Sequence, residues 1–303
     1  MNDGWIKEYW EYMVASNFEE AIILKAVNFP KSFYKYKVLT LQALEGIRDD
    51  HIWLAEISSL NDPFECSLQF DNDACLRLYF GSDKFRLNFT KLTGQSLDNG
   101  EVISLTNSQK PFDQYLEICK SRNIPYNLDR DEQVNKSQRR WSEIVEEINK
   151  NLTICSFTLK EDSLLLWSHY ADQHKGICLE YDFENFNVIR AFIQPVNYRQ
   201  KVHKIQVFED FGAIQAIASS LIKSEDWSYE EEWRITIFKS DKNFVQKLPV
   251  PVPKAIYLGT RFSLNDKKLK DALFSIAAEK QIELYQMEKD SQKFRLIHKT
   301  SLA

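Results

Sequence analysis

The sequence predicts an α+β protein with a central mixed or antiparallel sheet, flanking helices and a helical insertion. Strand-like and helix-like patterns both occur along the chain, but they do not alternate strictly. Gly and Pro are scarce, 8 of each in 303 residues, which disfavours a loop-rich architecture. No GxGxxG follows a strand and no GxxxxGK[ST] occurs, so a doubly wound nucleotide-binding fold and a P-loop enzyme are both disfavoured.

Composition favours a large folded core. Hydrophobic residues make up 44% of the chain and aromatic residues 13%, which argues against wholesale disorder. The net charge of −5 gives no global electrostatic reason to expect nucleic-acid binding, and it predicts weak nonspecific affinity for DNA. A local basic stretch at Lys136, Arg139 and Arg140 alternates with acids, which is typical of a solvated helix face.

The five cysteines predict a reducing compartment. Their number is odd, no CxxC occurs, and most lie in apolar surroundings, so we expect buried free thiols. The first turns carry Asp3, Lys7 and Glu8, which is unlike a secretory signal. No apolar run approaches the roughly 20 residues that span a bilayer. We therefore expect a cytoplasmic protein without membrane association.

Residues 1–30 are expected to form a helical extension that Pro30 ends, and residues 31–303 one α+β domain. Polar residues at about 70–150 have helical periodicity, which predicts a helical insertion or lid, or else an integral helical layer. The remaining expected elements are strands at 33–37, 52–55, 152–157, 176–181, 189–196, 233–238 and 255–258, a helix with Leu41, Leu44 and Ile47 on one face, helices at about 162–172, 207–224 and 265–279, and one or two C-terminal strands.

Three short segments concentrate polar side chains that are candidates for a shared pocket. The first is the turn Asn61-Asp62-Pro63-Phe64-Glu65, which follows a strand. A turn fixed by proline at a strand end can direct polar side chains into a cleft. The alternative is an Asx-turn that stabilises only itself, with Glu65 in solvent.

The second segment joins Ser156 to a helix around residues 162–172. This helix is apolar nearly all round, so we expect it to be buried, with His169 needing a partner for its ring nitrogens. A satisfied core histidine is the alternative. His169 and His174 are five residues apart, which does not fit a helical metal pair, and no matching ligand set occurs. We therefore expect no metal site.

The third segment runs from Lys223 through Trp227 and Tyr229 to a strand expected to begin at Trp233. Because side chains alternate along a strand, Glu230, Glu232 and Arg234 are expected on one face. The alternative is a charged edge on which Arg234 pairs with a glutamate.

Six short motifs occur in order along the chain: Tyr34–Tyr36, Leu60–Glu65, Cys155–Phe157, Leu166–Tyr170 with Gly176, Tyr229–Arg234 and Ile256–Gly259. Together they resemble the uncharacterised bacterial family called domain of unknown function 2971. The resemblance covers most of residues 33–260, and several spaced motifs agree in order. It implies no reaction.

A more distant resemblance is to ADP-ribosyltransferase folds, which place a Glu/Gln-x-Glu before a late strand and a serine in an earlier one. This chain has Glu230-x-Glu232 and Ser156 in that order, although its first strand carries Lys35 and two tyrosines rather than His or Arg. The resemblance implies NAD as substrate. It assigns Glu232 to the ribose hydroxyl and the oxocarbenium-like transition state, and Glu230 to the acceptor.

The residues that this resemblance and the three segments bring together form one expected site. The catalytic set is Glu230, Glu232 and Arg234, and the expected NAD-binding residues are Tyr34, Lys35, Tyr36, Asn61, Asp62, Ser156, Trp167, His169 and Tyr170. Trp167 or Tyr170 is expected to stack on the nicotinamide. The site requires that Glu232, Tyr36, Ser156 and Asn61 line one cleft.

The leading expectation is an NAD-using ADP-ribosyltransferase-like enzyme or NAD glycohydrolase, acting as a bacterial defence or toxin effector. Its acceptor is left open between nucleic acid, protein and small molecule, and its oligomeric state is also open. One alternative is a metal-dependent hydrolase or nuclease using Asp62, Glu65, Glu230 and Glu232. Another is a non-catalytic ligand-sensing or interaction module, in which Arg234 ties Glu232 to the turn acids and His169 caps the core.

Overall fold

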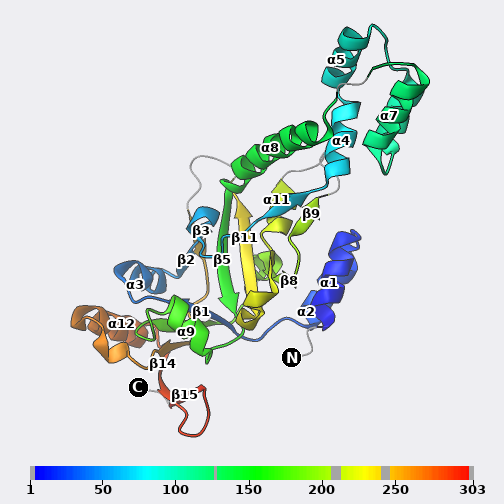
Figure 1. Ribbon diagram of the computed structural model, residues 1–303. Coiled ribbons are helices and arrows are strands. Elements are labelled where there is room, and N and C mark those ends of the chain that lie inside the picture. The colour runs from blue at the N-terminus through cyan, green and yellow to red at the C-terminus, as the bar shows by residue number, and fades with distance from the viewer. Residues whose placement is uncertain (1–3, 126–127, 206–212, 240–245, 300–303) are drawn as a thin grey trace. The chain divides into compact units, whose positions relative to one another are not determined.

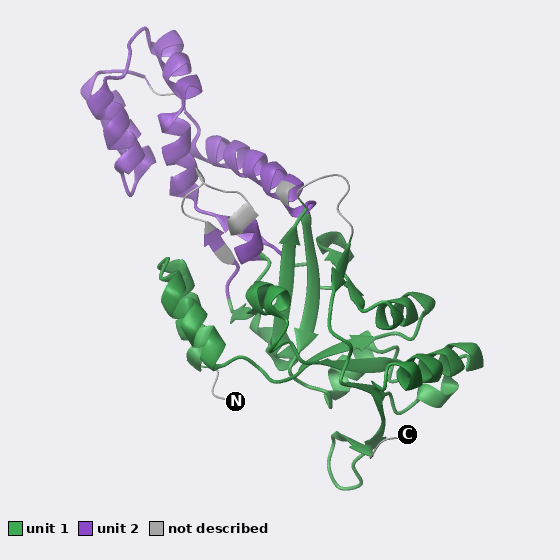
Figure 2. Cartoon of the chain, turned by 180° about the vertical axis from the view of Figure 1, so that it is seen from behind, with its two compact units in different colours: residues 1–65, 152–200, 220–303 green, residues 66–151, 201–219 purple. Residues whose placement is uncertain are grey.

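The computed structural model describes residues 4–125, 128–205, 213–239 and 246–299 (Figure 1). The chain divides into two compact units, which are coloured separately in Figure 2. Unit 1 contains residues 1–65, 152–200 and 220–303, and unit 2 contains residues 66–151 and 201–219. Within the described ranges, no helix is both long and apolar enough to cross a membrane.

Unit 1 is built on a nine-stranded mixed sheet, which confirms the predicted mixed α+β class. All neighbouring strands in it are antiparallel except the parallel pair β13–β14. The order along the main path is β15 (Leu296–Lys299), β14 (Glu283–Lys289), β13 (Ala255–Leu258), β6 (Ile177–Tyr181), β1 (Phe33–Lys37), β5 (Leu152–Thr158), β11 (Glu232–Phe238) and β7 (Ile193–Pro195), with β3 (Ala55–Glu56) beside β5.

Shorter elements complete unit 1. Two further strand pairs are β2 (His51–Trp53) with β12 (Lys247–Pro249), and β8 (Asn197–Arg199) with β10 (Ile222–Ser224). The helices are α1 (Gly4–Val14), α2 (Phe18–Val27), α3 (Leu41–Arg48), α9 (Leu164–Tyr170), α10 (Asn187–Phe192) and α12 (Lys267–Glu279), with 3-10 turns η1 (Ile57–Ser59), η2 (Glu225–Glu230) and η3 (Phe262–Leu264).

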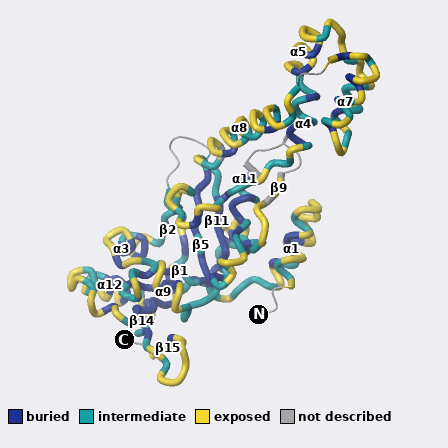
Figure 3. The backbone as a smooth tube through the Cα atoms, viewed as in Figure 1, coloured by how far each residue is buried: buried dark blue, intermediate teal, exposed yellow. Residues whose placement is uncertain are grey.

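The central pair β5–β11 separates an apolar face from a polar one. Phe157 and Trp233 lie opposite each other in the register and are both buried, and Phe33 packs on Trp233 with ring centroids 5.4 Å apart. Since side chains alternate along a strand, Ser156 and Arg234, also paired in register, occupy the other face. Burial along both strands is visible as dark blue tubing in Figure 3. The polar face carries the site described below.

Unit 2 is mainly helical, and its described elements at 72–149 agree with the helical periodicity predicted there. Its core is aromatic, with Phe80 stacked on Tyr115 at a centroid distance of 5.4 Å and Phe85 packed beside both rings. The elements are β4 (Leu68–Phe70), α4 (Asn72–Gly81), α5 (Asp83–Thr93), α6 (Asn99–Asn107), α7 (Pro111–Ser121), α8 (Arg130–Asn149), β9 (His203–Ile205) and α11 (Ala213–Ser219). A role for this segment as a lid stays a prediction.

Several expected elements differ from the structure. The N-terminal helix is two helices, because the backbone at Ser16 is left-handed with φ 61°. The strand predicted at 189–196 begins as helix α10 and becomes strand β7 only at Ile193. The helix predicted at 207–224 is described as helical only over Ala213–Ser219 and ends in strand β10, while residues 207–212 lie outside the described residues. The expected burial is confirmed for all five cysteines.

Candidate functional site

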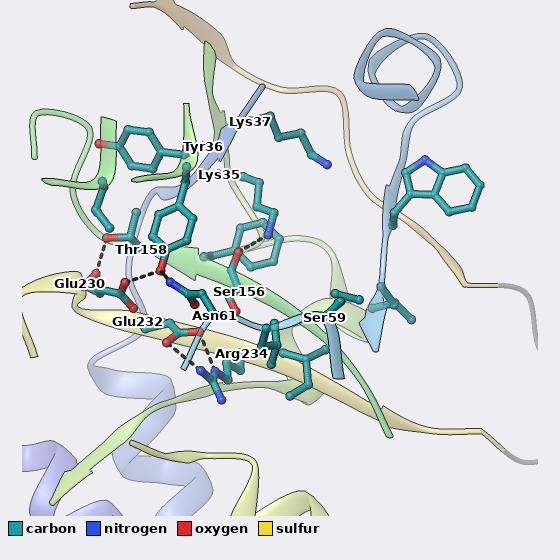
Figure 4. A pocket seen from close by; sticks show the side chains of 18 of the residues that line it. Lys35, Tyr36, Lys37, Ser59, Asn61, Ser156, Thr158, Glu230, Glu232 and Arg234 are labelled. Atoms are coloured by element: carbon teal, nitrogen blue, oxygen red, sulfur yellow. Dashed lines mark hydrogen bonds and ion pairs between the residues drawn. The ribbon is translucent and has the colours of Figure 1, made fainter. Parts of the chain in front are cut away.

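Most of the predicted site residues line one pocket of about 540 Å³ in unit 1 (Figure 4). Its polar wall is drawn from β1, the turn after η1, β5, the end of η2 and β11. The predicted residues that line it are Tyr34, Lys35, Tyr36, Asn61, Ser156, Tyr170, Glu230, Glu232 and Arg234. The requirement that Glu232, Tyr36, Ser156 and Asn61 share one cleft is therefore confirmed.

Arg234 is the centre of a buried charge network at one end of the pocket. Its Nη1 and Nη2 atoms donate to the two carboxylate oxygens of Glu65, each at 2.6 Å. On its other side, Nε donates to Oε1 of Glu232 at 2.6 Å and Nη2 to Oε2 at 3.0 Å. The fixed fork of a guanidinium suits such bidentate pairing. The ion pairing that the non-catalytic alternative predicted is thus present.

Lys223 joins the same network from strand β10. Its Nζ atom donates to Oε2 of Glu230 at 2.6 Å and to Oε2 of Glu232 at 3.0 Å, and lies 3.9 Å from Oε1 of Glu65. The side chains of all five network residues are at most 5% exposed. Three carboxylates against two cations leave one net negative charge when all are ionised.

The pKa values of the two neighbouring glutamates are shifted in opposite directions. Burial alone would raise the pKa of Glu232, but the charges of Arg234 and Lys223 outweigh it and hold the pKa at about 2. Burial raises the pKa of Glu230, and the attraction of Lys223 offsets this only in part. Such divergent carboxylate pairs are typical of sites that hold one ionised group and one proton carrier.

Neutral donors complete the shell around Glu230. The hydroxyl of Tyr170 donates to Oε1 of Glu230 at 2.8 Å, and Asn61 Nδ2 donates to the tyrosine oxygen at 3.3 Å. The hydroxyl of Thr158 donates to the backbone carbonyl of Glu230. Burial raises the pKa of Tyr170, which keeps its hydroxyl protonated as a donor. Glu230 is therefore held in place by Tyr170 and Thr158, which lie far from it in the sequence.

Two lysines lie toward the other end of the pocket. Lys35 and Lys37 extend from the same face of β1, as Figure 4 shows, and Trp53 also lines the pocket. The Nζ atom of Lys35 donates to the backbone carbonyl of Ser156 at 2.7 Å. Burial, with the neighbouring charge of Lys35, lowers the pKa of Lys37 to about 8. This end of the pocket suits an anionic or aromatic group.

The carboxylates do not form a metal site in this geometry. Across the part of the chain that the structure describes, no group of three or more His, Cys, Asp or Glu side chains is arranged to hold an ion. The Lys223 ammonium lies among Glu65, Glu230 and Glu232, in the place that a cation would need. The alternative of a metal-dependent hydrolase therefore has no support from the arrangement of these residues.

Three predicted residues lie outside the pocket lining. Trp167 is fully buried in a neighbouring cluster, where its indole N–H donates to the carbonyl of Glu161 at 2.8 Å. His169 is exposed, and so are Leu164 and Leu165 of the same helix, so the prediction of a helix buried all round was wrong. Asp62 is buried and accepts from the backbone N–H of Phe64 at 2.8 Å, which is the self-stabilising Asx-turn of the alternative interpretation.

Glu230 reaches the site by a different route from the one predicted. It ends the 3-10 turn η2, and Glu231 between it and the strand is left-handed with φ 44°. Only Glu232 and Arg234 share a face of strand β11. The expectation of three residues on one strand face was wrong, although the three side chains do meet.

Sequence reasoning missed several lining residues, including Lys37, Trp53 and Gln246. Glu65 was expected as a partner of Arg234 only in the non-catalytic alternative, and Lys223 was noticed but not as a partner of the glutamates. Lys223 lies on β10, which pairs in parallel with β8 through Tyr198, and that pairing gives no local signal. The alternation Lys35-x-Lys37 on an aromatic strand was the one available sign of the cationic end.

The fold and site define a mixed α+β protein with a pocket that has a buried charge network at one end. In the comparison with family models, residues 166–235 match the family described as protein of unknown function (DUF2971). The matched segment includes most of α9, Lys223 and the Glu230–Arg234 run, which supports the resemblance found in the sequence. Searches of curated proteins and of solved structures gave no match.

The depressed pKa of Glu232 predicts a pH-dependent contribution to stability. Because the pKa falls from 4.5 to about 2 on folding, the ionised carboxylate stabilises the protein above pH 4.5 and this contribution is lost as the pH falls towards 2. Wild type and Glu232→Gln should therefore differ in unfolding free energy by on the order of a few kcal/mol at pH 7, and less below pH 4.5. Chemical denaturation between pH 7 and pH 3 measures the difference. A gap that widens on acidification would contradict it.

Proposed function

We propose that the chain is an NAD-using enzyme of ADP-ribosyltransferase-like or NAD-glycohydrolase type, and that the pocket described above binds NAD as substrate. One observation carries this proposal: nine residues predicted for that chemistry from separate segments line a single pocket of about 540 Å³. That volume lies within the range of small-molecule sites, roughly 300–1,000 Å³.

The proposed reaction breaks the bond between nicotinamide and C1′ of the ribose. The bonding electron pair leaves with nicotinamide, C1′ acquires oxocarbenium character, and water or an acceptor forms the new bond to C1′ while losing a proton. A carboxylate close to C1′ stabilises the developing positive charge, and a carboxylate with a raised pKa can also take the proton. The network supplies both kinds of carboxylate, in Glu232 and Glu230.

The geometry favours Glu230 as the group that meets the substrate. Its Oε1 atom accepts a hydrogen bond from Tyr170, and its Oε2 atom accepts from Lys223. Glu232 accepts from Arg234 on both oxygens and from Lys223 on one. We therefore assign Glu232 to positioning of Lys223 and Arg234, which exchanges the roles that the sequence resemblance implied.

The cationic end of the pocket supports the same class of substrate. Lys35 and Lys37 can pair with a diphosphate, and Trp53 can pack against a planar ring. A defence or toxin role in the bacterial cytoplasm would follow from consumption of NAD there. The acceptor could be water, a nucleic acid, a protein or a small molecule.

The test is incubation of the whole chain with NAD and chromatographic measurement of released nicotinamide, with thermal unfolding followed in parallel. We expect release above the uncatalysed rate and a Tm that rises with NAD concentration. At 100 times the Kd the added stability is about 2.7 kcal/mol. The absence of both release and any Tm change at millimolar NAD would reject the proposal.

A non-catalytic ligand-binding module is the second candidate, and the complete pairing of the buried charges favours it. Glu65, Glu230 and Glu232 each contact a cation of the chain, which is what a structural network requires. In this case NAD or another anionic ligand would raise the Tm and yet no nicotinamide would be released. The same pair of measurements therefore separates the two candidates.

A further inference from the structure

A second pocket of unit 1, distinct from the one assigned above, lies under the loop that joins β14 to β15. Its volume is about 470 Å³. The walls come from the start of α9, the turn after it, the segment following β13 and the β14–β15 loop itself, which is the red loop in Figure 1. None of its lining residues belongs to the first pocket.

The lining of this second pocket is strongly cationic. Arg261, Lys289, Lys293 and Arg295 all contribute, against Asp290 as the one carboxylate among the lining residues. Arg295 Nε pairs with Asp290 at 2.7 Å. Within the described residues, no ion pair joins Arg261, Lys289 or Lys293 to a carboxylate. Three positive charges in a concave surface therefore remain available in a chain whose net charge is −5.

His174 adds a buried polar atom that has no partner. Its Nδ1 atom is inaccessible to solvent and makes no hydrogen bond to any residue that the structure describes. Burial, with the charges of Arg261 and Lys289, lowers the pKa of His174, so the ring is neutral near pH 7. The residue itself lines the pocket beside Arg261 and Lys289, and its buried Nδ1 atom is not a contact point for a ligand there.

The turn that carries His174 is held in a costly conformation. Asp172, Gln173 and His174 are consecutive left-handed residues with φ of 45°, 52° and 71°. Such runs of non-glycine residues are rare and persist where the surroundings fix them, often at ligand sites. The carbonyl of His174 accepts from the backbone N–H of Arg261 at 2.9 Å, which places both side chains at the same pocket.

Glycine at positions 259 and 176 makes the close approach of neighbouring backbone segments possible. A Cβ atom at Gly259 would lie 2.1 Å from the carbonyl oxygen of His174, and one at Gly176 would lie 2.2 Å from that of Lys37. Any other residue at either position would push the turn away. The position of His174 beside Arg261 is therefore set by the backbone itself.

An aromatic ring stands beside the cations. Phe294 lines the pocket between Lys293 and Arg295 and is fully exposed. Because this ring is exposed, it contributes no hydrophobic stabilisation to the folded chain. Aromatic rings next to basic groups are the usual means of holding a base and its phosphate together.

From these contacts we propose that the pocket under the β14–β15 loop binds a nucleoside phosphate. The phosphate contacts Arg261 and Lys289, and the base stacks on Phe294. The ligand is either a free nucleotide or the phosphorylated end of a nucleic-acid strand, since both present the same chemistry. This proposal does not depend on the function proposed for the first pocket.

Binding of three probes to the whole chain tests it: AMP, a single-stranded deoxyoligonucleotide with a 5′ phosphate, and inorganic phosphate. We expect Arg261→Ala with Lys289→Ala to weaken binding of the nucleotide probe about tenfold or more. Phe294→Ala should weaken the nucleotide about tenfold and leave inorganic phosphate unchanged. AMP binding identifies a free nucleotide as the ligand, and binding of the oligonucleotide alone identifies a strand end.

Two control variants make the result specific. Lys299→Ala removes an exposed cation of β15 that pairs with Glu288 outside the pocket, and it should leave binding unchanged. Lys37→Ala alters the first pocket. A probe that binds this variant as tightly as it binds wild type is therefore bound at the second pocket. The proposal is overturned if no probe binds at millimolar concentration, or if binding is insensitive to the Arg261, Lys289 and Phe294 substitutions.

Discussion

Glu230→Gln is expected to slow nicotinamide release from NAD by about 100-fold or more, the range in which loss of a general base falls. The substitution keeps an oxygen for the Tyr170 hydroxyl, but it removes the proton acceptor and the negative charge beside Lys223. Lys223 still has Glu232 and Glu65 as partners, so the fold should persist. The readout is kcat against KM, and we expect most of the loss in kcat.

Glu231→Gln is the matched control for this prediction. Glu231 is adjacent in sequence but pairs with Lys160 at 2.8 Å and is absent from the pocket lining. Nicotinamide release by this variant should remain within a factor of about two of wild type, since exposed ion pairs contribute little. Equal losses in the two variants would show that Glu230 acts only through general damage to this turn.

Arg234→Met is expected to lower the free energy of unfolding by about 3–5 kcal/mol, the usual cost of removing one partner from a buried ion pair. The guanidinium is 1% exposed, and it neutralises Glu65 and Glu232 while also donating to the carbonyl of Ser220 at 2.6 Å. Its removal leaves two buried carboxylates with only Lys223 between them. Chemical denaturation followed by circular dichroism measures the loss.

Arg86→Met provides the comparison. Arg86 pairs with Asp83 at 2.5 Å, but the two side chains are 45% and 87% exposed, so the change should cost no more than about 0.5 kcal/mol. Should Arg234→Met cost as little as Arg86→Met, the buried network would contribute nothing to stability. The acids near 230 would then be free for catalysis alone.

Elements with a strong local pattern could be predicted from the sequence. Short apolar segments predicted β5 and β11, and α12 was predicted within two residues of its start. Elements fixed by distant partners could not be predicted. Strand β10 exists because it pairs with β8, and the switch from α10 to β7 depends on pairing of Ile193 with Ile235 of β11.

The site could be predicted in part for the same reason. Residues on regular strands, such as Ser156 and Arg234, lie where alternation placed them. Glu230 lies in a turn whose left-handed residue no periodicity reveals, and Lys223 reaches the network only through tertiary structure. His169 was misplaced because apolar residues on a short helix do not show which face is covered.

Gly176 and Gly259 allow the main chains beside the two pockets to come into contact. Lys37 of the first pocket and His174 of the second pocket belong to segments that touch through bare main chain at Gly176 and Gly259. At this junction there is no rotamer that could adjust to a displacement. A side chain added at Gly176 would displace the main chain of Lys37, and one added at Gly259 would displace that of His174, so a single substitution at this junction would disturb the backbone beside a pocket.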